Sequence, residues 1–415
     1  MDIDFLEKSN PLAFNVSGRE KFQFALDEAW ELAELQHDIG NLCFESRQIS
    51  ERQIIPENIL LPGCLLEGQH GPAFVEILPI DICNHACDWC FTAASRSVRF
   101  IQPNQLRARL EHFISVGGKS VLFSGGGEPL LYKPLIRSNS EFDGKTVIEW
   151  LSDRNIIIGL ITNGVYLDRF IEAHSGYLSK TMAFIRISLD ACTAADYSLC
   201  HQANQNDFGL AIDSIKAAVS CRDKLNNTPA IGVSFVVDGN SGLNAQPEAI
   251  DAIQKLATDL EVDYVQLKHA HTNNEHAADA LMLKISKWIA TVFPQRPEFW
   301  IHRYQSSRAS QKCYLPLTSQ VLRADGARSP CCHLQGISVP EQESAYGFSP
   351  FMVHNCTSNA CRFVSMNRLL DKMFKYPTDY INALYRLKHS LMQDGFHPYR
   401  LFPSAPDLVA APHNI

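Results

Sequence analysis

Three cysteines in the run Ile82-Cys-Asn-His-Ala-Cys-Asp-Trp-Cys-Phe91 stand close enough together to share one inorganic centre. Cys83, Cys87 and Cys90 follow the spacing C-x3-C-x2-C. Three thiolates on a short loop can hold three irons of a cubane 4Fe-4S cluster, and the fourth iron then takes its ligand from elsewhere. Such an open iron can bind a substrate or a cofactor. The alternative is a structural zinc site, but that usually takes four protein ligands in two spaced pairs, and this loop offers three.

A second motif follows downstream, in Val121-Leu-Phe-Ser-Gly-Gly-Gly-Glu-Pro129. An apolar strand runs directly into three glycines, an acid and a proline, which mark the end of the strand. A ligand can approach the backbone closely at glycine because no Cβ intervenes. Taken alone, this run could be an ordinary turn. Its position after the three cysteines makes the combination far more specific than either motif.

Together the two motifs resemble the signature of the radical S-adenosylmethionine (SAM) superfamily. In those enzymes the amino and carboxylate groups of SAM chelate the open iron. The reduced cluster cleaves SAM to methionine and a 5'-deoxyadenosyl radical, which abstracts a hydrogen atom from the substrate. The resemblance implies three kinds of site residue: cluster ligands at Cys83, Cys87 and Cys90, a cofactor contact at Phe91, and an ammonium site for SAM at Gly125, Gly126, Gly127 and Glu128.

Residues 72–272 alternate strand and helix, which predicts parallel strands joined by crossover helices. The expected strands are Ala73 to Leu78, Ser120 to Phe123, Ile156 to Thr162, Phe184 to Leu189, Ile231 to Val237 and Tyr264 to Lys268. The expected helices include Gln105 to Val116, Thr146 to Asp153, Phe208 to Arg222 and Pro247 to Leu260. The predicted class is α/β. Six such units match the partial (β/α)6 barrel that the resemblance implies, with chemistry at the carboxyl ends of the strands.

Three further strand ends carry candidate residues. Thr162-Asn163-Gly164 resembles the family's turn near SAM, which makes Asn163 a candidate cofactor contact. Strand period 2 sets Ser188 and Asp190 on the polar face of the fourth strand, and the resemblance makes them candidates for the carboxylate and ribose of SAM. The alternative for this pair is a local polar network that closes the barrel. Lys268 and His269, after the sixth strand, are candidate substrate contacts and proton acceptors; the alternative is a solvated or hydrogen-bonded histidine pair with His271.

The last third of the chain contains a second cysteine group. Cys313, Gly326 and Cys331 resemble the opening C-x(9 to 15)-G-x4-C of the SPASM and twitch domains, which bind auxiliary Fe-S clusters. Leu322 to Ala327 is expected to be the tip of a hairpin. The resemblance implies that Cys313, Cys331, Cys356 and Cys361 complete one auxiliary 4Fe-4S cluster, with Cys332 as an alternative ligand. A structural zinc site with the same four thiolates is the other interpretation.

Composition narrows the classes of protein further. The chain has 415 residues, 46% of them hydrophobic, a net charge of −8 and 13 cysteines. The absence of a long apolar run or a signal-like N-terminus predicts a cytoplasmic protein with no membrane span. No block of Lys and Arg is present, which disfavours an extended nucleic-acid polymer as partner. The predicted organisation is a helical extension over 1–71, the barrel over 72–272, an auxiliary cluster domain over 273–365 and a helical tail over 366–415.

The resulting hypothesis is a radical SAM enzyme of oxidoreductase or isomerase type, served by a reductant such as flavodoxin or ferredoxin. It would abstract hydrogen from a small polar metabolite, such as a sugar, aminocyclitol or nucleoside, for oxidation, dehydration or epimerisation in a biosynthetic reaction. The first alternative is a maturase that modifies a peptide or protein. The second is a radical isomerase that acts on a modified nucleobase.

Overall fold

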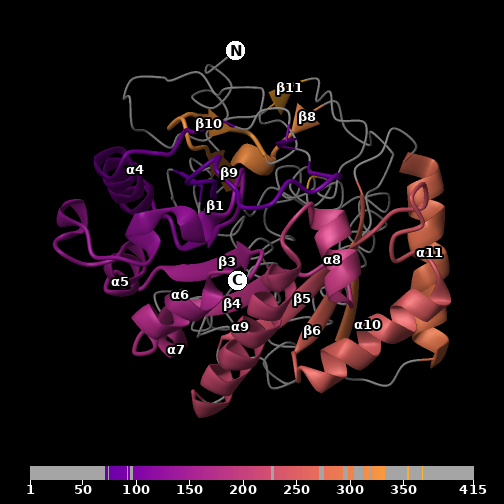
Figure 1. The fold of residues 1–415 in the computed structure, drawn as a ribbon. Helices are drawn as coiled ribbons and strands as arrows, with labels where there is room; N and C mark the ends of the chain where they lie inside the picture. The colour runs from indigo at the N-terminus through magenta and orange to yellow at the C-terminus, as the bar shows by residue number, and fades with distance from the viewer. Residues whose placement is uncertain are drawn as a thin grey trace, which may run out of the picture.

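The computed structural model describes residues 71–72, 74–90, 92–93, 97–225, 229–270, 275–292, 298–302, 312–317, 319–331, 353–354 and 367. The helical segments predicted over 1–71 and 366–415 lie outside these residues, apart from residues 71 and 367. Within the described part, strands and helices alternate along the chain, and Figure 1 shows the helices ranged along the outside of a curved sheet.

The main sheet has nine strands in the order β10-β9-β1-β2-β3-β4-β5-β6-β7. All neighbouring strands run parallel except the β9/β10 pair. In chain order, the strands are β1 (Phe74–Ile77), β2 (Ser120–Phe123), β3 (Ile157–Thr162), β4 (Met182–Ser188), β5 (Ala230–Val237), β6 (Tyr264–His269), β7 (Glu298–His302), β9 (Ser319–Leu322) and β10 (Arg328–Ser329). Separately, β8 (Lys312–Cys313) pairs with β11 (Val353–His354).

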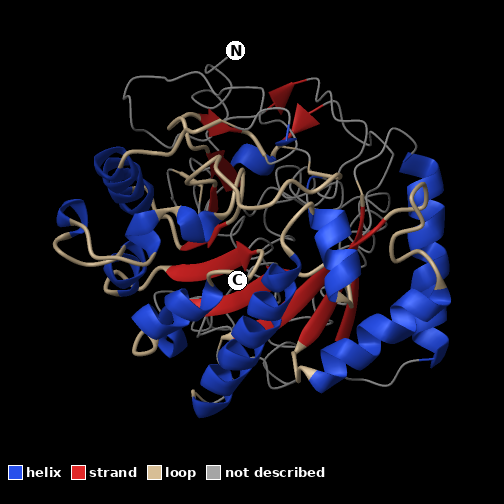
Figure 2. Ribbon diagram, viewed as in Figure 1, coloured by secondary structure: helices blue, strands red, loops and turns tan. Residues whose placement is uncertain are grey.

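Helices join the strands and cover one face of the sheet (Figure 2). They are α4 (Pro103–Ser115), α5 (Val147–Ser152), α6 (Leu167–His174), α7 (Leu178–Thr181), α8 (Ala194–His201), α9 (Gln205–Lys224), α10 (Pro247–Asp259) and α11 (Glu275–Val292). Short 3-10 turns occur at η5 (Pro129–Leu131), η6 (Lys133–Leu135), η7 (Ser140–Phe142) and η8 (Leu315–Leu317). The predicted parallel α/β barrel is confirmed, since each predicted strand and helix is present with ends displaced by less than a helical turn.

Local sequence explains where the helices begin. α4 and α10 each start at a proline, whose fixed φ suits the first helical position. α5 begins with a capping box in which Glu149 N–H donates to Thr146 Oγ1 at 3.2 Å and Thr146 N–H donates to Glu149 Oε2 at 2.8 Å. These signals fix the ends of the crossover helices, and thereby the direction in which each strand runs.

The two faces of the sheet differ in polarity. On the face toward the helices, alternate residues of β4, β5 and β6 belong to one large apolar core, among them Ile187, Phe235 and Leu267. Strand period 2 therefore directs the residues between them to the opposite, inner face. About half of those inner positions carry polar side chains, namely Arg186, Ser188, Ser234, Gln266 and Lys268; the others include Phe184, Gly232, Val236 and Tyr264. A polar inner face is costly to bury unless it meets a ligand or partners.

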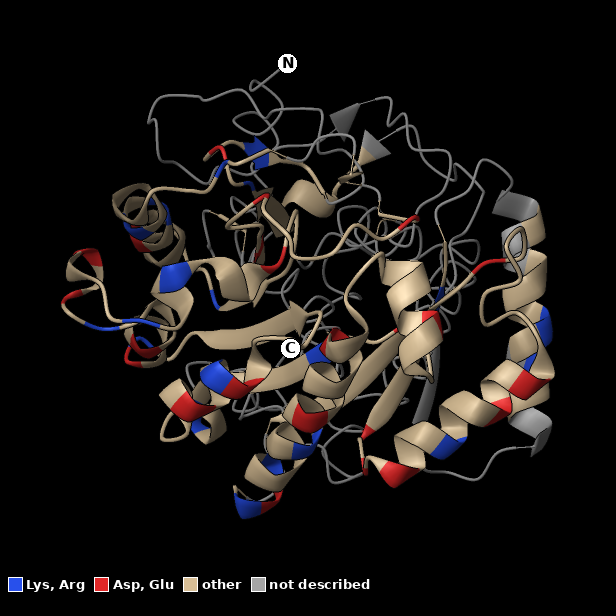
Figure 3. Cartoon of the chain, viewed as in Figure 1, with Lys and Arg blue, Asp and Glu red and all other residues tan. Residues whose placement is uncertain are grey.

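Basic and acidic residues both occur along α9 and α10 (Figure 3). The described helices include none that is long and apolar enough to cross a membrane.

The strands after residue 272 bear on the predicted auxiliary domain. β7 and β9 continue the same sheet, and β9 runs parallel to β1 with Leu322 level with Ile77. The predicted hairpin tip is confirmed, because Arg323 N–H donates to Ala327 O at 2.9 Å between antiparallel β9 and β10. Buried Arg109 of α4 donates from Nη2 to Gly326 O at 3.0 Å. The hairpin that precedes Cys331 is therefore attached to the barrel, and the limits 273–365 stay a prediction.

The centre of the sheet makes a stability prediction. At Gly232 of β5, a Cβ would lie 2.0 Å from the Tyr264 ring, which is fully buried. Because the core has no room to relax, Gly232→Ala is expected to lower the free energy of unfolding by about 1–3 kcal/mol. Gly209→Ala, at an exposed site on α9 with nothing within 4 Å of its Cβ, is the control, and is expected to raise it by about 0.5–1 kcal/mol. Urea unfolding measures the free energy of unfolding of the two variants. Equal changes in this free energy would contradict the packing argument.

Candidate functional site

The carboxyl ends of β1, β2 and β3 meet in one hydrogen-bonded assembly. The segment 81–93, here called the cluster loop, follows β1 and contains Cys83, Cys87 and Cys90. Gly127 N–H donates to Ile80 O at 2.8 Å, and Glu128 N–H donates to Ile82 O at 2.9 Å. The glycine turn after β2 therefore pairs with the first residues of the cluster loop.

Glycine is required at this contact. At Gly127, a Cβ would lie 2.0 Å from Ile82 O, and at Gly125 it would lie 1.9 Å from Gly127 O. At Gly126 it would meet Asp81 Oδ1 at 2.9 Å, and Gly126 O already accepts from Thr92 Oγ1 at 2.7 Å. No L side chain fits at Gly125 or Gly127, where backbone approaches this closely, whereas at Gly126 the Asp81 side chain would have to move. The glycine motif thus holds the cluster loop in place, whatever ligand it also meets.

Glu128 is the electrostatic centre of the assembly. Its carboxyl group is 2% exposed and accepts three hydrogen bonds: from Thr162 Oγ1 at 2.6 Å, from Leu130 N–H at 3.0 Å and from Asn163 N–H at 2.8 Å. Burial raises the pKa of Glu128 from 4.5 to about 7, although these bonds oppose the rise. Glu128 therefore connects the ends of β2 and β3, with its oxygens already facing protein donors.

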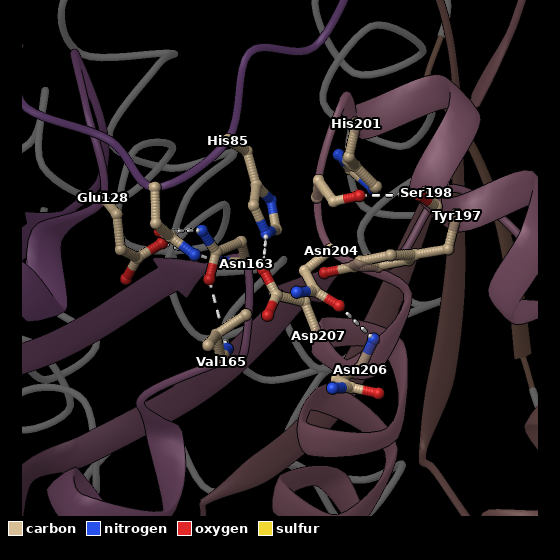
Figure 4. A network of polar contacts seen from close by, with 12 residues as sticks. His85, Glu128, Asn163, Val165, Tyr197, Ser198, His201, Asn204, Asn206 and Asp207 are labelled. Atoms are coloured by element: carbon tan, nitrogen blue, oxygen red, sulfur yellow. Dashed lines mark hydrogen bonds and ion pairs between the residues drawn. The ribbon is translucent and has the colours of Figure 1, made fainter.

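Asn163 links the third strand to the cluster loop. Its Nδ2 donates to Asn84 Oδ1 at 2.8 Å, and its Oδ1 accepts from Val165 N–H at 3.1 Å (Figure 4). Gly164 follows at φ +87°, where its Cβ would also meet Ile187 Cγ2 at 2.9 Å. The Nδ2 of Asn84 is buried and has no partner among the described residues. A buried donor without an acceptor beside the first cysteine fits a site made for a bound group.

A polar group lies near each cysteine sulfur of the cluster loop. His85 N–H lies 3.5 Å from Cys83 Sγ, Thr92 Oγ1 lies 3.1 Å from Cys90 Sγ, and His201 Nδ1 lies 2.9 Å from Cys87 Sγ. All three thiols are half-buried. Thiolate ligands with hydrogen-bond partners, next to a buried unpaired amide, fit an Fe-S cluster. Phe91 lies outside the described residues.

A mixed ligand set at the same place supports an alternative metal. His85, Cys87 and His201 offer atoms within 4.8 Å of one another, which could hold a single ion such as zinc. Such an ion would take Cys87 away from Cys83 and Cys90. The iron-to-zinc ratio of the purified protein separates the two interpretations.

Sequence reasoning missed a group of residues around this loop. His85 is buried and donates from Nε2 to Asp207 Oδ2 on α9 at 3.2 Å, while its ring lies 5.6 Å edge-on to Tyr197 of α8 (Figure 4). His201, the last residue of α8, is 1% exposed. Only the presence of a histidine inside the cysteine motif could have drawn attention to His85. Nothing local in the sequence brings α8 or Asp207 to the loop.

Asp190 forms the polar network that the sequence left as the alternative. β4 ends at Ser188, so the period-2 argument does not extend to Asp190, which has φ +59°. Its Oδ1 accepts from Val236 N–H at 2.7 Å, and its carbonyl accepts from Asn244 Nδ2 at 2.8 Å. Asp190 thereby joins the ends of β4 and β5. Ser188 keeps its inner-face position, with Oγ 3.4 Å from Ser234 Oγ.

The structure separates the predicted pair on β6. Lys268 occupies an inner-face position, whereas His269 is one residue further, on the helix side, and is 5% exposed. His269 Nδ1 lies 2.8 Å from Ala270 O. The expectation that both side chains point to the same place does not agree with this alternation. Of the two, Lys268 has the position that a substrate contact needs.

The second cysteine group is only partly described. Cys313 ends β8, and Cys331 follows β10; both are half-buried. Cys332, Cys356 and Cys361 lie outside the described residues. Cys192 and Cys200 have no ligand spacing, and burial raises their pKa values to about 11 and about 12. These two remain thiols at neutral pH and act as small apolar residues.

Comparison with known proteins identifies the domain. Residues 77–224 match the family model of the radical SAM superfamily. The chain contains a radical SAM domain. That domain spans the cluster loop, the glycine turn, Asn163 and the helices α8 and α9. No protein with a curated description matches the chain.

Solved structures agree with the fold. The chain is similar to Streptococcus suis SuiB bound to the precursor peptide SuiA, with TM-score 0.50 and 14% identity over 67% of this chain and 64% of that chain. A further match is anSMEcpe with bound AdoMet, with TM-score 0.45 and 17% identity over 63% of this chain and 74% of that chain. Another is BtrN in complex with AdoMet and 2-DOIA, with TM-score 0.25 and 15% identity over 63% of this chain and 73% of that chain. This chain spans less than two thirds of SuiB, and the likeness to it shows a shared fold.

The buried carboxyl group makes a pH prediction. Because the folded pKa of Glu128 lies above its unfolded value, the folded protein binds more protons between pH 4.5 and 7, and stability falls as the pH rises through that window. The cluster-free protein is therefore expected to lose about 3 kcal/mol of unfolding free energy relative to Glu128→Gln over this range. Urea unfolding at several pH values measures the difference. Glu248→Gln, at an exposed carboxylate on α10, is the control, and a difference between the protein and E128Q that is independent of pH would contradict the account.

Proposed function

We propose that this chain is an active radical SAM enzyme, with Cys83, Cys87 and Cys90 as the ligands of a 4Fe-4S cluster. The observation that carries the proposal is the assembly of three loops, in which the glycine turn and Asn163 both bond to the loop that bears the cysteines. A bound cluster supplies the electron that cleaves SAM to methionine and a 5'-deoxyadenosyl radical. The protein's own residues bind and orient the reactants around it.

The residues have distinct tasks in this proposal. The glycine turn 125–127 presents backbone to the ammonium group of SAM without a Cβ in the way. Buried Glu128 fixes that turn against Thr162 and Asn163, and its charge, when the group is ionised, favours a cation nearby. Ser188 lies on the inner face and is available to the cofactor.

The polar inner face favours a polar substrate. Ser188, Ser234, Gln266 and Lys268 lie on adjacent strands, with Ser234 paired to Ser188 on one side and to Gln266 on the other. A small hydroxylated metabolite, such as a sugar, aminocyclitol or nucleoside, offers hydrogen-bonding groups that match such a surface. Loss of a hydrogen atom from a carbinol carbon acidifies its hydroxyl group, and in this proposal Lys268 in its neutral form accepts that proton. Oxidation, dehydration and epimerisation all begin with the loss of a hydrogen atom from such a carbon.

A peptide substrate is the second candidate. The SuiB structure, which has a similar fold, holds a precursor peptide. This likeness supports peptide modification as an activity of the present chain. A peptide would also need a recognition surface outside the barrel. Transfer of deuterium from substrate to 5'-deoxyadenosine distinguishes the candidates, when deuterated polyols and deuterated peptides are offered in turn.

We further propose one auxiliary cluster, bound by Cys313, Cys331, Cys356 and Cys361, with Cys332 able to replace one of them. The hairpin before Cys331 is tied to α4 through Arg109, and this contact supports a ligand position beside the barrel. A cluster there would accept an electron from a substrate radical, and a low-potential donor such as flavodoxin or ferredoxin would reduce the first cluster.

Loss of the three cluster-loop thiols tests the main proposal. After anaerobic reconstitution, reduction with SAM is expected to yield 5'-deoxyadenosine from the unaltered protein and none from the variant with Cys83, Cys87 and Cys90 changed to Ala. That variant should also lose about four irons per chain. Cys221→Ala, on α9, is the matched control and should keep both. Chromatography and iron assay measure the outcome; product from the triple variant would overturn the proposal.

The auxiliary cluster has a separate test. Cys313→Ala combined with Cys331→Ala is expected to lower the iron content from about eight to about four per chain, because half of the proposed ligand set is removed. Formation of 5'-deoxyadenosine should persist, since the SAM-binding loop is untouched. Loss of zinc in place of iron would show a structural zinc site, and an unchanged metal content would show that these cysteines bind none.

A further inference from the structure

His201 connects the cluster loop to the end of β4. The imidazole is 1% exposed at the last residue of α8, and the residue's carbonyl accepts from Ala86 N–H at 2.9 Å. The next residue, Gln202, has φ +47° and donates from its side chain to Asp88 Oδ1. The end of α8 is thus hydrogen-bonded on both sides of Cys87.

The two ring nitrogens of His201 face different elements. Nδ1 lies 2.9 Å from Cys87 Sγ, while Nε2 lies 3.1 Å from Leu189 O and 3.7 Å from Asp190 Oδ2. A ring with partners on both edges cannot rotate without losing one of them. The position of Cys87 Sγ is therefore coupled to the carboxyl end of β4.

Aromatic neighbours hold the ring in this orientation. The ring centroid of Tyr197 lies 4.4 Å away, that of His85 5.1 Å and that of Trp89 5.7 Å. Figure 4 shows His85, Tyr197 and His201 gathered between the cluster loop and α8. This packing leaves Nδ1 directed at the sulfur.

We propose that His201 is a positioning residue for the cluster, and that its Nδ1–H donates to the thiolate of Cys87 and raises the reduction potential. The inference rests on the proposed function, because it requires Cys87 as an iron ligand. A ligated thiolate only accepts hydrogen bonds, so Nδ1 is the donor once iron is bound. Leu189 O and Asp190 Oδ2 also only accept, so Nε2 carries a hydrogen as well, and the Asp190 carboxylate faces the resulting positive ring. Hydrogen bonds to cluster sulfurs favour the more negative, reduced state and so raise the potential.

Of the sulfur contacts named above, those to Cys83 and Cys90 come from weaker donors. Cys83 faces the backbone N–H of His85 at 3.5 Å. Near Cys90, Thr92 commits its single hydroxyl hydrogen to Gly126 O at 2.7 Å, so its oxygen has no second hydrogen for the sulfur. Among these three neighbours, His201 is the side chain whose replacement should change the potential most.

Two amide variants of His201 distinguish the contact made by Nδ1 from the contact made by Nε2. In His201→Asn, the amide nitrogen can occupy the place of Nδ1 and still donate to Cys87, but the contact with Leu189 is lost. In His201→Gln, the longer side chain reaches the place of Nε2 and loses the sulfur. Leu199→Asn, at a 76% exposed position on the same helix, is the control for a change on α8. Circular dichroism first establishes that each variant is folded.

Potentiometric titration of the reconstituted proteins without SAM, followed by electron paramagnetic resonance, reads the midpoint potential. For H201Q we expect about a tenfold lower ratio of reduced to oxidised cluster at a fixed potential, which is a shift of about 59 mV for one electron. H201N and L199N should stay close to the unaltered protein. Poor loading of H201Q beside full loading of H201N would also support the proposal.

Other results would overturn the inference. Equal midpoint potentials in H201Q and the unaltered protein would show that the His201–Cys87 hydrogen bond does not affect the cluster. Equal shifts of the midpoint potential in H201Q and H201N would show that His201 acts only through packing. In both cases the cluster itself is present, so the proposed function stands. Absence of any cluster from the unaltered protein is the separate result that would overturn the proposed function.

Discussion

The close backbone approach between the glycine turn and the cluster loop is the contact on which the site depends. Ile82 O lies 2.0 Å from the place that a Cβ on Gly127 would take. Glu128 N–H donates to Ile82 O in the loop, and Gly127 N–H donates to Ile80 O just before it. The backbone beside Cys83 is therefore placed by the end of β2. A cluster ligand set that arises this way is preorganised by the fold.

Around this contact, carboxyl groups are buried, whereas carboxyl groups of most proteins lie on the surface. Glu128 is buried with three donors and a pKa near 7, while the nearest polar groups of β4 and β5 are tied together by Asp190. The apolar core behind the sheet keeps water from the helix side. On the inner face, Ser188 and Lys268 are half-buried, whereas Arg186, Ser234 and Gln266 are buried. The same architecture thus fixes the cluster loop and carries polar side chains on its inner face.

Much of this organisation could be predicted from the sequence, because its signals are local. Apolar runs and glycine breaks located the six barrel strands, and the two spaced motifs pointed to their shared edge. The role of His201 could not be predicted, since it depends on how α8 folds over the loop. For Asp190, the sequence left open a cofactor contact or a local polar network; its carboxylate bonds within such a network, at a positive φ that ends the strand alternation. The pairing of Lys268 with His269 ignored the same alternation, which sends neighbours to opposite faces.

The central claim is that the cluster loop leaves one iron open and that SAM binds it through its amino group. Electron–nuclear double resonance on the reduced, reconstituted protein with SAM labelled by nitrogen-15 at that amino group tests this most directly. The account predicts a nitrogen-15 hyperfine coupling that depends on the label and disappears when SAM is omitted. A reduced cluster that forms fully and shows no such coupling in the presence of saturating SAM would contradict it.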